Sequence, residues 1–432
     1  MESDVSVIKF ANNIQTSSTI IIQNNRIVTF YSPLEPSHLI ADGSFDVIRI
    51  ESGGTLALKY VDITRQSGTE GRGIYNLGIL HIYDSVIKGH VNNNTAALGW
   101  GSGIHNAHGS NLIMWNGNIF NNTVAGVGGG VYISPSSNFI MNGGRISNNV
   151  AEGNGGGVFN RGSFTMNNGS IYSNRSENSG GGVFNDGGKF TMNSGSISHN
   201  TANNWGGGVR NHSIENGAVG IFLMHYGIIS DNIVMTYSGG GVDNRGNFYM
   251  YGGTVSNNVA VGAGGVDNRA KFNMVGGEIT GNIAKENAGG VRNRAGGTFN
   301  LYRGIITSNL ANEHIGGVSN LGYFFMDGGE ILYNTAIGNV GGVGNSASGE
   351  FTLLNGYISQ NTAVRAGGVL NLGMFTMRGG TISHNEATDT AGGVENRNEA
   401  YFTMYLGYIK HNVAEWGGGV SNIGSFLLCE EA

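Results

Sequence analysis

The sequence predicts an all-β fold, a parallel β-helix built from stacked coils. Three observations lead to this prediction. Glycine accounts for 77 of the 432 residues, far above the roughly 7% of an average globular chain. A unit of about 26 residues recurs along most of the chain. Apolar and polar residues alternate in pieces of about three to five residues, which is the period of a strand and too short for a helix.

The repeat is anchored by an apolar residue that follows a run of glycines. One copy reads GGVFNRGSFTMNNGSIYSNRSENSG, and another reads GGVLNLGMFTMRGGTISHNEATDTA. A single unit cannot bury its own apolar face, so the copies must stack, and we expect about 15 to 16 coils. The anchor positions are Ile74, Ile104, Val131, Val158, Val183, Val209, Val242, Val266, Val291, Val318, Val343, Val369, Val394 and Val420.

Each coil is predicted to contain three short strands separated by Gly, Asn and Ser. The first has the pattern Val-x-Asn (residues 158–160), the second Phe-x-Met (residues 164–166), and the third centres on an isoleucine such as Ile171. Coils stacked about 4.8 Å apart place each side chain over its equivalent in the next coil. The Phe, Met and Ile positions should therefore form inward columns, with methionine as core filler.

Two columns of asparagine mark turns of the coil. Asn160 and Asn185 belong to the first column, and Asn174 and Asn200 belong to the second. Asparagine tolerates left-handed backbone and can hydrogen-bond to its neighbours along a stack. Because these residues recur in nearly every coil, we interpret them as an asparagine ladder that supports the scaffold, and not as catalytic groups.

The repeat also sets the expected domain boundaries. Residues 1–44 are predicted to form an N-terminal cap with the first irregular coils, and residues 45–432 the β-helix repeat domain. The long spacing between Val209 and Val242 predicts an insertion near residues 212–220. The sequence stops partway through a coil, so we expect a fragment, or an end that stacks against a partner or further chain.

Composition excludes several classes of function. The chain has 23 basic and 29 acidic residues and a net charge of −6, which does not favour binding to nucleic acid or to a membrane surface. No apolar run is long enough for a membrane-spanning helix, and no export signal is seen at the N-terminus. Cys429 is the only cysteine, and no Cys/His spacing indicates zinc, so we expect no metal and no cofactor.

The repeat resembles a known group of surface proteins. The string GGGV-x-N, then Phe-x-Met, then Asn-Thr-Ala (residues 200–202, 334–336 and 361–363) is similar to the polymorphic outer-membrane-protein type of β-helix repeat. That repeat is marked by GGA before Ile, Leu or Val, and by FxxN, and this chain departs from it by carrying Gly-Gly-Val. The resemblance covers about residues 45–428. It implies a right-handed single-stranded β-helix, in agreement with the usual hand of parallel crossovers, and an adhesin-like role at the cell surface.

Function is expected at the outward positions, because the inward ones are taken by the core. The residue between Val and Asn is aromatic on five successive coils, and a row of exposed rings suits stacking on sugars or contact with a protein. Packing under a loop is the alternative interpretation. These candidate binding residues are Tyr75, His105, Tyr132, Phe159 and Phe184.

A charged block follows on later coils. Asp243 and Asp267 occupy the position between Val and Asn, and Arg245, Arg269 and Arg294 lie two residues after it on their own coils. Two carboxylates on one face are what a glycan-cleaving enzyme needs as acid and base, and stacked arginines could hold uronate carboxylates. A salt-bridge ladder is the alternative interpretation.

These patterns favour a non-enzymatic, adhesin-like or surface-display protein, extracellular or at the cell surface, that binds a surface glycan or a protein receptor. One alternative is a carbohydrate-active β-helix enzyme, a polysaccharide lyase or glycoside hydrolase, with Asp243 and Asp267 as its catalytic candidates. A second alternative is a phage or viral receptor-binding spike.

Overall fold

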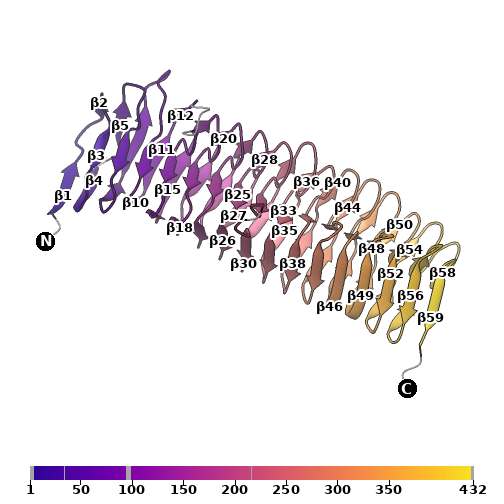
Figure 1. Ribbon diagram of the computed structural model, residues 1–432. Coiled ribbons are helices and arrows are strands. Elements are labelled where there is room, and N and C mark those ends of the chain that lie inside the picture. Colours follow the sequence, from indigo (N-terminus) through magenta and orange to yellow (C-terminus); the bar gives the residue numbers. More distant parts are fainter. Residues whose placement is uncertain (1–3, 34, 94–98, 216, 430–432) are drawn as a thin grey trace. The chain divides into compact units, whose positions relative to one another are not determined.

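The computed structural model describes residues 4–33, 35–93, 99–215 and 217–429. The chain divides into two compact units, Met1–Phe222 and Leu223–Ala432. The fold is a parallel β-solenoid of the right-handed type, with about 16 coils of roughly 26 residues and three sheets (Figure 1). The predicted fold class is therefore confirmed.

In each unit the first sheet is built from the Val-x-Asn strands, which pair in register with their equivalents one coil away. Val158, Phe159 and Asn160, for example, pair with the same three residue types one coil further on. In the first unit these strands are β3 (Ile20–Ile22), β6 (Ile48–Ile50), β9 (Ile74–Asn76), β13 (Ile104–Asn106), β17 (Val131–Ile133), β21 (Val158–Asn160), β25 (Val183–Asp186) and β29 (Val209–His212). In the second unit they are β33 (Val242–Arg245), β37 (Val266–Asn268), β41 (Val291–Asn293), β45 (Val318–Asn320), β48 (Val343–Asn345), β51 (Val369–Asn371), β55 (Val394–Asn396) and β58 (Val420–Asn422).

The second sheet holds both the Phe-x-Met strands and the isoleucine strands. The sequence separates these two pieces, but the bend between them leaves both in one sheet. In the first unit the Phe-x-Met set is β1 (Asp4–Lys9), β4 (Arg26–Tyr31), β7 (Thr55–Lys59), β10 (Ile79–Tyr83), β14 (Asn111–Met114), β18 (Asn138–Met141), β22 (Ser163–Met166) and β26 (Lys189–Met192). Its isoleucine set is β2 (Ile14–Thr16), β5 (Ser37–Ala41), β8 (Val61–Arg65), β11 (Ser85–Lys88), β15 (Gly117–Phe120), β19 (Arg145–Ser147), β23 (Ser170–Tyr172) and β27 (Ser196–Ser198).

The second unit repeats this arrangement. β30 (Ile221–Met224) contains the point at which the units divide. The Phe-x-Met set is β34 (Asn247–Met250), β38 (Lys271–Met274), β42 (Thr298–Leu301), β46 (Tyr323–Leu332), β49 (Glu350–Ser359), β52 (Met374–Met377), β56 (Tyr401–Met404) and β59 (Ser425–Leu428). The isoleucine set includes the second halves of β46 and β49, together with β31 (Ile228–Ser230), β35 (Thr254–Ser256), β39 (Glu278–Thr280), β43 (Ile305–Thr307), β53 (Thr381–Ser383) and β57 (Tyr408–Lys410).

The third sheet consists of two-residue strands that follow the second asparagine column. In the first unit they are β12 (Val91–Asn92), β16 (Thr123–Val124), β20 (Val150–Ala151), β24 (Arg175–Ser176) and β28 (Thr201–Ala202). In the second unit they are β32 (Ile233–Val234), β36 (Val259–Ala260), β40 (Ile283–Ala284), β44 (Leu310–Ala311), β47 (Thr335–Ala336), β50 (Thr362–Ala363) and β54 (Glu386–Ala387). The expected insertion is confirmed as an irregular segment between β29 and β30.

The core of each unit is a stack of identical side chains. Phe139 and Phe164 in the first unit lie with ring centroids 4.9 Å apart, and Phe248 and Phe272 in the second lie 4.7 Å apart. These rings are fully buried. The spacing equals the distance between coils, so the predicted inward columns are confirmed.

Both asparagine ladders are present. In the first, Asn244 Nδ2 donates to Asn268 Oδ1 at 2.8 Å. In the second, Asn258 Nδ2 donates to Asn282 Oδ1 at 2.9 Å, and Asn282 Oδ1 also accepts from the Asn258 backbone N–H. The ladders therefore satisfy buried polar groups at two corners of most coils and confirm the scaffold interpretation.

Candidate functional site

The strands of the Val-x-Asn sheet carry the predicted site residues, except that Arg269 and Arg294 come directly after the ends of β37 and β41. These strands present two positions away from the core: the residue between Val and Asn, and the residue directly after Asn. Strand pairing places each position over its equivalent in the neighbouring coil, as Asp243 pairs with Asp267 and Tyr132 with Phe159. Any chemistry at these positions is therefore repeated at the spacing of the coils, about 4.8 Å.

The expectation that the residue between Val and Asn is exposed is wrong. The exposed fraction is 2% for Tyr132, 3% for Phe159 and 5% for Phe184. His105 is also buried, and Tyr75 is half-buried beneath the guanidinium groups of Arg49 and Arg72. The aromatic column is therefore mostly covered, as the alternative interpretation of packing under a loop anticipated.

A glycine corner explains this burial. The first glycine of the GGG run has a positive φ and folds back over the residue between Val and Asn. At Gly128, with φ +74°, an added Cβ would lie 3.1 Å from both Cα and Cβ of Tyr132. At Gly239, also with φ +74°, it would lie 2.9 Å from Asp243 Cα. Only glycine permits this close approach of backbone, and the approach covers the side chain below.

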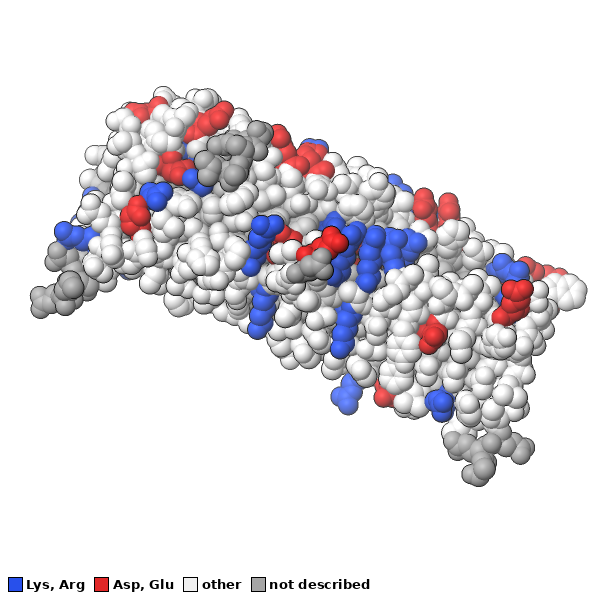
Figure 2. Space-filling view, in the orientation of Figure 1, with Lys and Arg blue, Asp and Glu red and all other residues white. Residues whose placement is uncertain are grey.

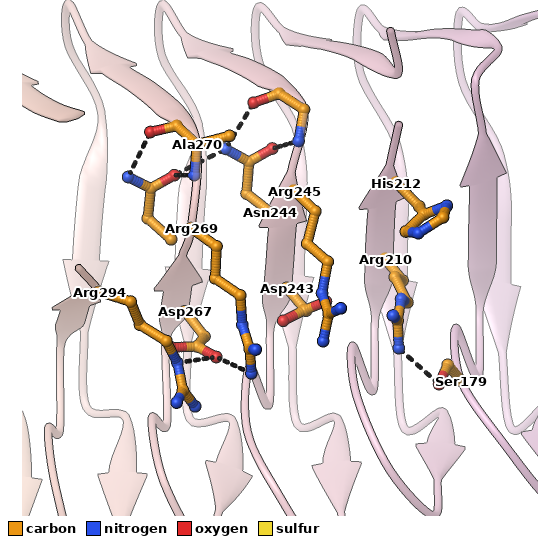
Figure 3. A network of polar contacts seen from close by, with 12 residues as sticks. Ser179, Arg210, His212, Asp243, Asn244, Arg245, Asp267, Arg269, Ala270 and Arg294 are labelled. Atoms are coloured by element: carbon orange, nitrogen blue, oxygen red, sulfur yellow. Dashed lines mark hydrogen bonds and ion pairs between the residues drawn. The ribbon is translucent and has the colours of Figure 1, made fainter. Parts of the chain in front are cut away.

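Asp243 lies under this corner, and Asp267 is also fully buried although Ala263 takes the place of the first glycine in its coil. Both aspartates contact arginine (Figure 3). Asp267 accepts from Arg294 Nε at 2.8 Å (Oδ1) and 3.0 Å (Oδ2), and its Oδ2 lies 3.5 Å from Arg269 Nη2. Asp243 Oδ2 lies 3.5 Å from Arg245 Nε. Carboxylates with no exposed surface cannot reach a polysaccharide chain, so this geometry speaks against a catalytic pair.

Arg245, Arg269 and Arg294 form what we call the arginine ladder. Their side chains are 28%, 29% and 25% exposed. Each arginine directly follows an asparagine of the first ladder in the sequence. The space-filling view shows basic side chains crowded over the region around β33 (Figure 2). The three arginines therefore present a row of guanidinium groups at the surface of the second unit.

Arg292 adds a fourth positive charge beside the ladder. It pairs in register with Asp267, and its Nε is buried without a hydrogen-bond partner among the described residues. Burial, together with the charge of Arg294, lowers the pKa of Arg292. Burial also lowers the pKa of Arg269, although Asp267 and Asp243 oppose this. Four arginines, two aspartates and Glu286, whose charge acts on Arg292, leave a formal surplus of one positive charge that solvent or an anionic ligand must compensate.

The aromatic column of the first unit is a continuous stack. Tyr132 and Phe159 lie 5.4 Å apart between ring centroids, and Phe159 and Phe184 lie 5.2 Å apart, with each pair nearly parallel. Trp100, from the preceding corner, stacks on Tyr132 at 5.2 Å and is 37% exposed. The rings therefore face one another, and their edges point outward.

The sequence interpretation missed three residues of the first unit. Arg161, Asp186 and His212 occupy the position directly after Asn, or its equivalent, on three successive coils. Asp186 Oδ2 accepts from Arg161 Nε at 2.8 Å, and its Oδ1 lies 2.9 Å from His212 Nδ1. The signal that could have identified them is the column itself, because the arginine ladder occupies the same position in the second unit.

A wide groove in the second unit follows from the stacking of glycines. Its lining includes Gly329, Gly356, Tyr357 and Tyr408, and its volume is about 900 Å³. Gly356 has a φ of +110°, and an added Cβ would lie 2.6 Å from the Gly329 carbonyl oxygen. The glycines are therefore required for close contact between coils, and the groove by itself is no sign of a ligand.

Two further findings bear on the kind of site. Among the described residues, no three His, Cys, Asp or Glu side chains are grouped to hold a metal ion. The part of the chain that the structure describes also contains no helix with the length and apolarity to cross a membrane.

The fold defines the protein as a right-handed parallel β-solenoid. No family model, curated protein or solved structure matches the chain.

Proposed function

We propose that the protein is a non-enzymatic, adhesin-like surface or display protein that binds an acidic glycan through the arginine ladder. The observation that carries this proposal is the surplus of guanidinium groups over carboxylates around Asp267. Each coil contributes one arginine fork, and such forks match carboxylate and sulfate groups. A row of positive groups across successive coils suits a polyanion that runs along the row.

The burial of the two aspartates supports binding over catalysis. A general acid or base must contact the glycosidic oxygen or a nearby proton, whereas Asp243 and Asp267 have no exposed surface. Their effect on the site is electrostatic: they fix the direction of Arg245 and Arg294 and offset part of the positive charge. We therefore assign them a positioning role.

A surface location is the second part of the proposal. It is supported by the likeness of the GGGV-x-N and Phe-x-Met strings to the repeat of adhesin-like surface proteins. Protease treatment or antibody labelling of intact cells that produce the protein tests it. Protection of the protein until the cells are opened would contradict a surface location.

The binding test compares polygalacturonate, dextran sulfate and neutral dextran immobilised on a sensor surface. The wild-type protein should bind one or both of the acidic polymers and not the neutral one, and binding should weaken as salt screens the charges. A preference for polygalacturonate would identify carboxylates, and a preference for dextran sulfate would identify sulfates. Equal binding to all three polymers, or to none, would contradict the proposal.

A compensated variant separates binding from stability. Replacing the ladder alone would leave buried carboxylates without partners, so the variant D243N/D267N/R245Q/R269Q/R294Q removes both signs of charge. It lowers the net charge by one, and R303Q, an exposed arginine outside the ladder, is its charge-matched control. We expect binding at least about tenfold weaker in the compensated variant, about 1.4 kcal/mol, and little change in R303Q.

The double variant D243N/D267N separates the proposal from the enzyme alternative. Removing two negative charges should strengthen binding of the acidic polymer. An enzyme that used these aspartates would instead shorten polygalacturonate in its wild-type form and lose that activity in the double variant. Depolymerisation with that dependence would replace our proposal.

A further inference from the structure

A second cavity with different chemistry lies in the first unit, and we call it the aromatic pocket. Its volume is about 340 Å³, at the lower end of the range for small-molecule sites. The edges of Tyr132, Phe159 and Phe184 form its floor. A cavity of this size accommodates one ring and not a polymer segment.

The polar groups on the rim of the pocket are held in fixed positions. One carboxylate oxygen of Asp186 accepts a hydrogen bond from Arg161, and the other is hydrogen-bonded to the Nδ1 atom of His212. Burial acts to raise the pKa of the Asp186 carboxyl, but the hydrogen bonds from His212 and Arg161 outweigh it and lower the pKa. Burial raises the pKa of Tyr132, and the nearby charge of Arg161 opposes this rise. The carboxylate is thus ionised, and the Arg161–Asp186 pair is neutral as a whole.

Two further polar side chains, Asn154 and His212, line the pocket. The Asn154 Oδ1 atom is buried with no hydrogen-bond partner among the described residues. His212 uses Nδ1 for Asp186, so its second ring nitrogen, Nε2, is the atom that a ligand would contact. A buried amide oxygen without a donor is costly, and a ligand hydroxyl would supply the missing donor.

Trp100 completes the pocket with an apolar surface. One face of its indole stacks on Tyr132, while about a third of the residue remains exposed beside the cavity. An exposed aromatic surface next to fixed donors and acceptors favours a ring that is apolar on its C–H face and rich in hydroxyls at its edge.

We propose that the aromatic pocket binds a single neutral pyranose, with its hydroxyls on Asn154, His212 and Arg161 and its C–H face against Trp100. Neutrality follows from the balanced Arg161–Asp186 pair, in contrast to the surplus of positive charge at the arginine ladder. This site is independent of the proposed acidic-glycan function, because its residues belong to the first unit and the ladder belongs to the second.

Saturation-transfer NMR with the full chain tests the proposal. The probes are the methyl glycosides of glucose, galactose, mannose, fucose and N-acetylglucosamine, with methyl galacturonate glycoside in its ionised form as the charged comparison. At least one neutral glycoside should receive saturation from the wild-type protein, with a Kd in the millimolar range that is typical of weak contacts worth about 4 kcal/mol. Transfer to none of the neutral glycosides, or to the charged one alone, would overturn the proposal.

The variants separate binding from folding. N154A removes one hydrogen-bond partner and should weaken binding about fivefold, and W100A should abolish the signal. W115A is the matched control, because Trp115 is similarly exposed and stacks on Tyr83 outside the pocket. Unchanged binding in both N154A and W100A would refute the site. The compensated ladder variant should bind the neutral glycoside normally, so failure of one proposal does not imply failure of the other.

Discussion

Acidification should destabilise the first unit through two buried histidines that are held in the neutral form. His90 Nδ1 accepts from Arg65 Nε at 3.2 Å, and His90 Nε2 lies 3.1 Å from the Ile63 carbonyl oxygen. Arginine can only donate and a carbonyl can only accept, so the single ring proton must reside on Nε2. Protonation of Nδ1 would therefore place two donors against each other inside the solenoid.

His105 repeats this arrangement one coil further on. Arg72 Nη1 lies 3.1 Å from its Nδ1, and Ser134 Oγ lies 3.2 Å from its Nε2. Burial, with the positive charge of Arg65 or Arg72 as the next cause, lowers the pKa of each histidine from 6.5 to about 3. Asp46 opposes the shift at His105 but does not cancel it.

The direction of the effect follows from proton uptake. Below pH 6.5 the unfolded chain binds a proton at each histidine, whereas the folded chain does not until about pH 3. The stabilisation is therefore complete above pH 6.5 and is lost as the pH falls between those values. The loss is about 1.4 kcal/mol per pH unit for each histidine, or about 2 kcal/mol each at pH 5 and about 4 kcal/mol for both.

Urea unfolding followed by tryptophan fluorescence at pH 7.5, 6 and 5 measures this loss. Trp100 is a local reporter, because its ring lies 6.0 Å from that of His105. The variant H90N/H105F removes both titrating groups. It places asparagine at the second-ladder position of His90 and phenylalanine at the aromatic-column position of His105. Its unfolding free energy should fall by about 4 kcal/mol less than that of the wild type between pH 7.5 and 5; His81, whose pKa burial also lowers, still titrates in both proteins. A wild-type stability that is flat over this range, or a variant that keeps the full pH dependence, would refute the reasoning.

Three further predictions concern the stack, and urea or thermal unfolding measures each. F272A leaves a ring-sized cavity between two coils and should cost about 3 to 5 kcal/mol, and a cost below about 1 kcal/mol would contradict the core assignment. N268A removes a ladder residue that bonds to both neighbouring coils and should cost about 3 kcal/mol, whereas N300A, with a single side-chain bond, should cost about 1 kcal/mol. G356A combines a positive φ with a clash against the next coil and should destabilise more than G296A, which has a positive φ of +76° but open space. Equal effects would mean that backbone strain alone, about 1 to 2 kcal/mol, dominates.

Most of the fold could be predicted from the sequence because the fold repeats. Phe248, Phe272 and Phe299, for example, occupy the same buried position in successive coils. Because the same residue type recurs at this position many times, the pattern is not a chance match. The partition into sheets could not be predicted in full. The two-residue strands such as Thr201–Ala202 follow a turn residue and are too short to show a period of two, so only the paired register identifies them.

The candidate site was predictable by position but not by exposure. Alternation along the strand correctly places Phe159 and Asp243 away from the core. It cannot show that the glycine corner of the same coil folds back over them, because this depends on the positive φ of Gly155 and Gly239. The sequence pattern GGG is compatible with an open turn and with a turn that folds back over the outward side chain. Only the close contacts of the glycine distinguish the two.

The residue directly after the first ladder asparagine is where this fold leaves the most freedom. Inward columns are fixed by packing, and ladder positions are fixed by hydrogen bonding, but this position accepts Leu77, Ala107, Leu321 and Ser346 without disturbing the register. Stacking therefore does not require a particular residue here. Even so, three consecutive coils of each unit carry charged or titratable side chains at this position. The set in the first unit includes a buried aspartate, and the set in the second contacts two. Because the fold does not demand these groups, their clustering is the observation from which we propose a role in recognition.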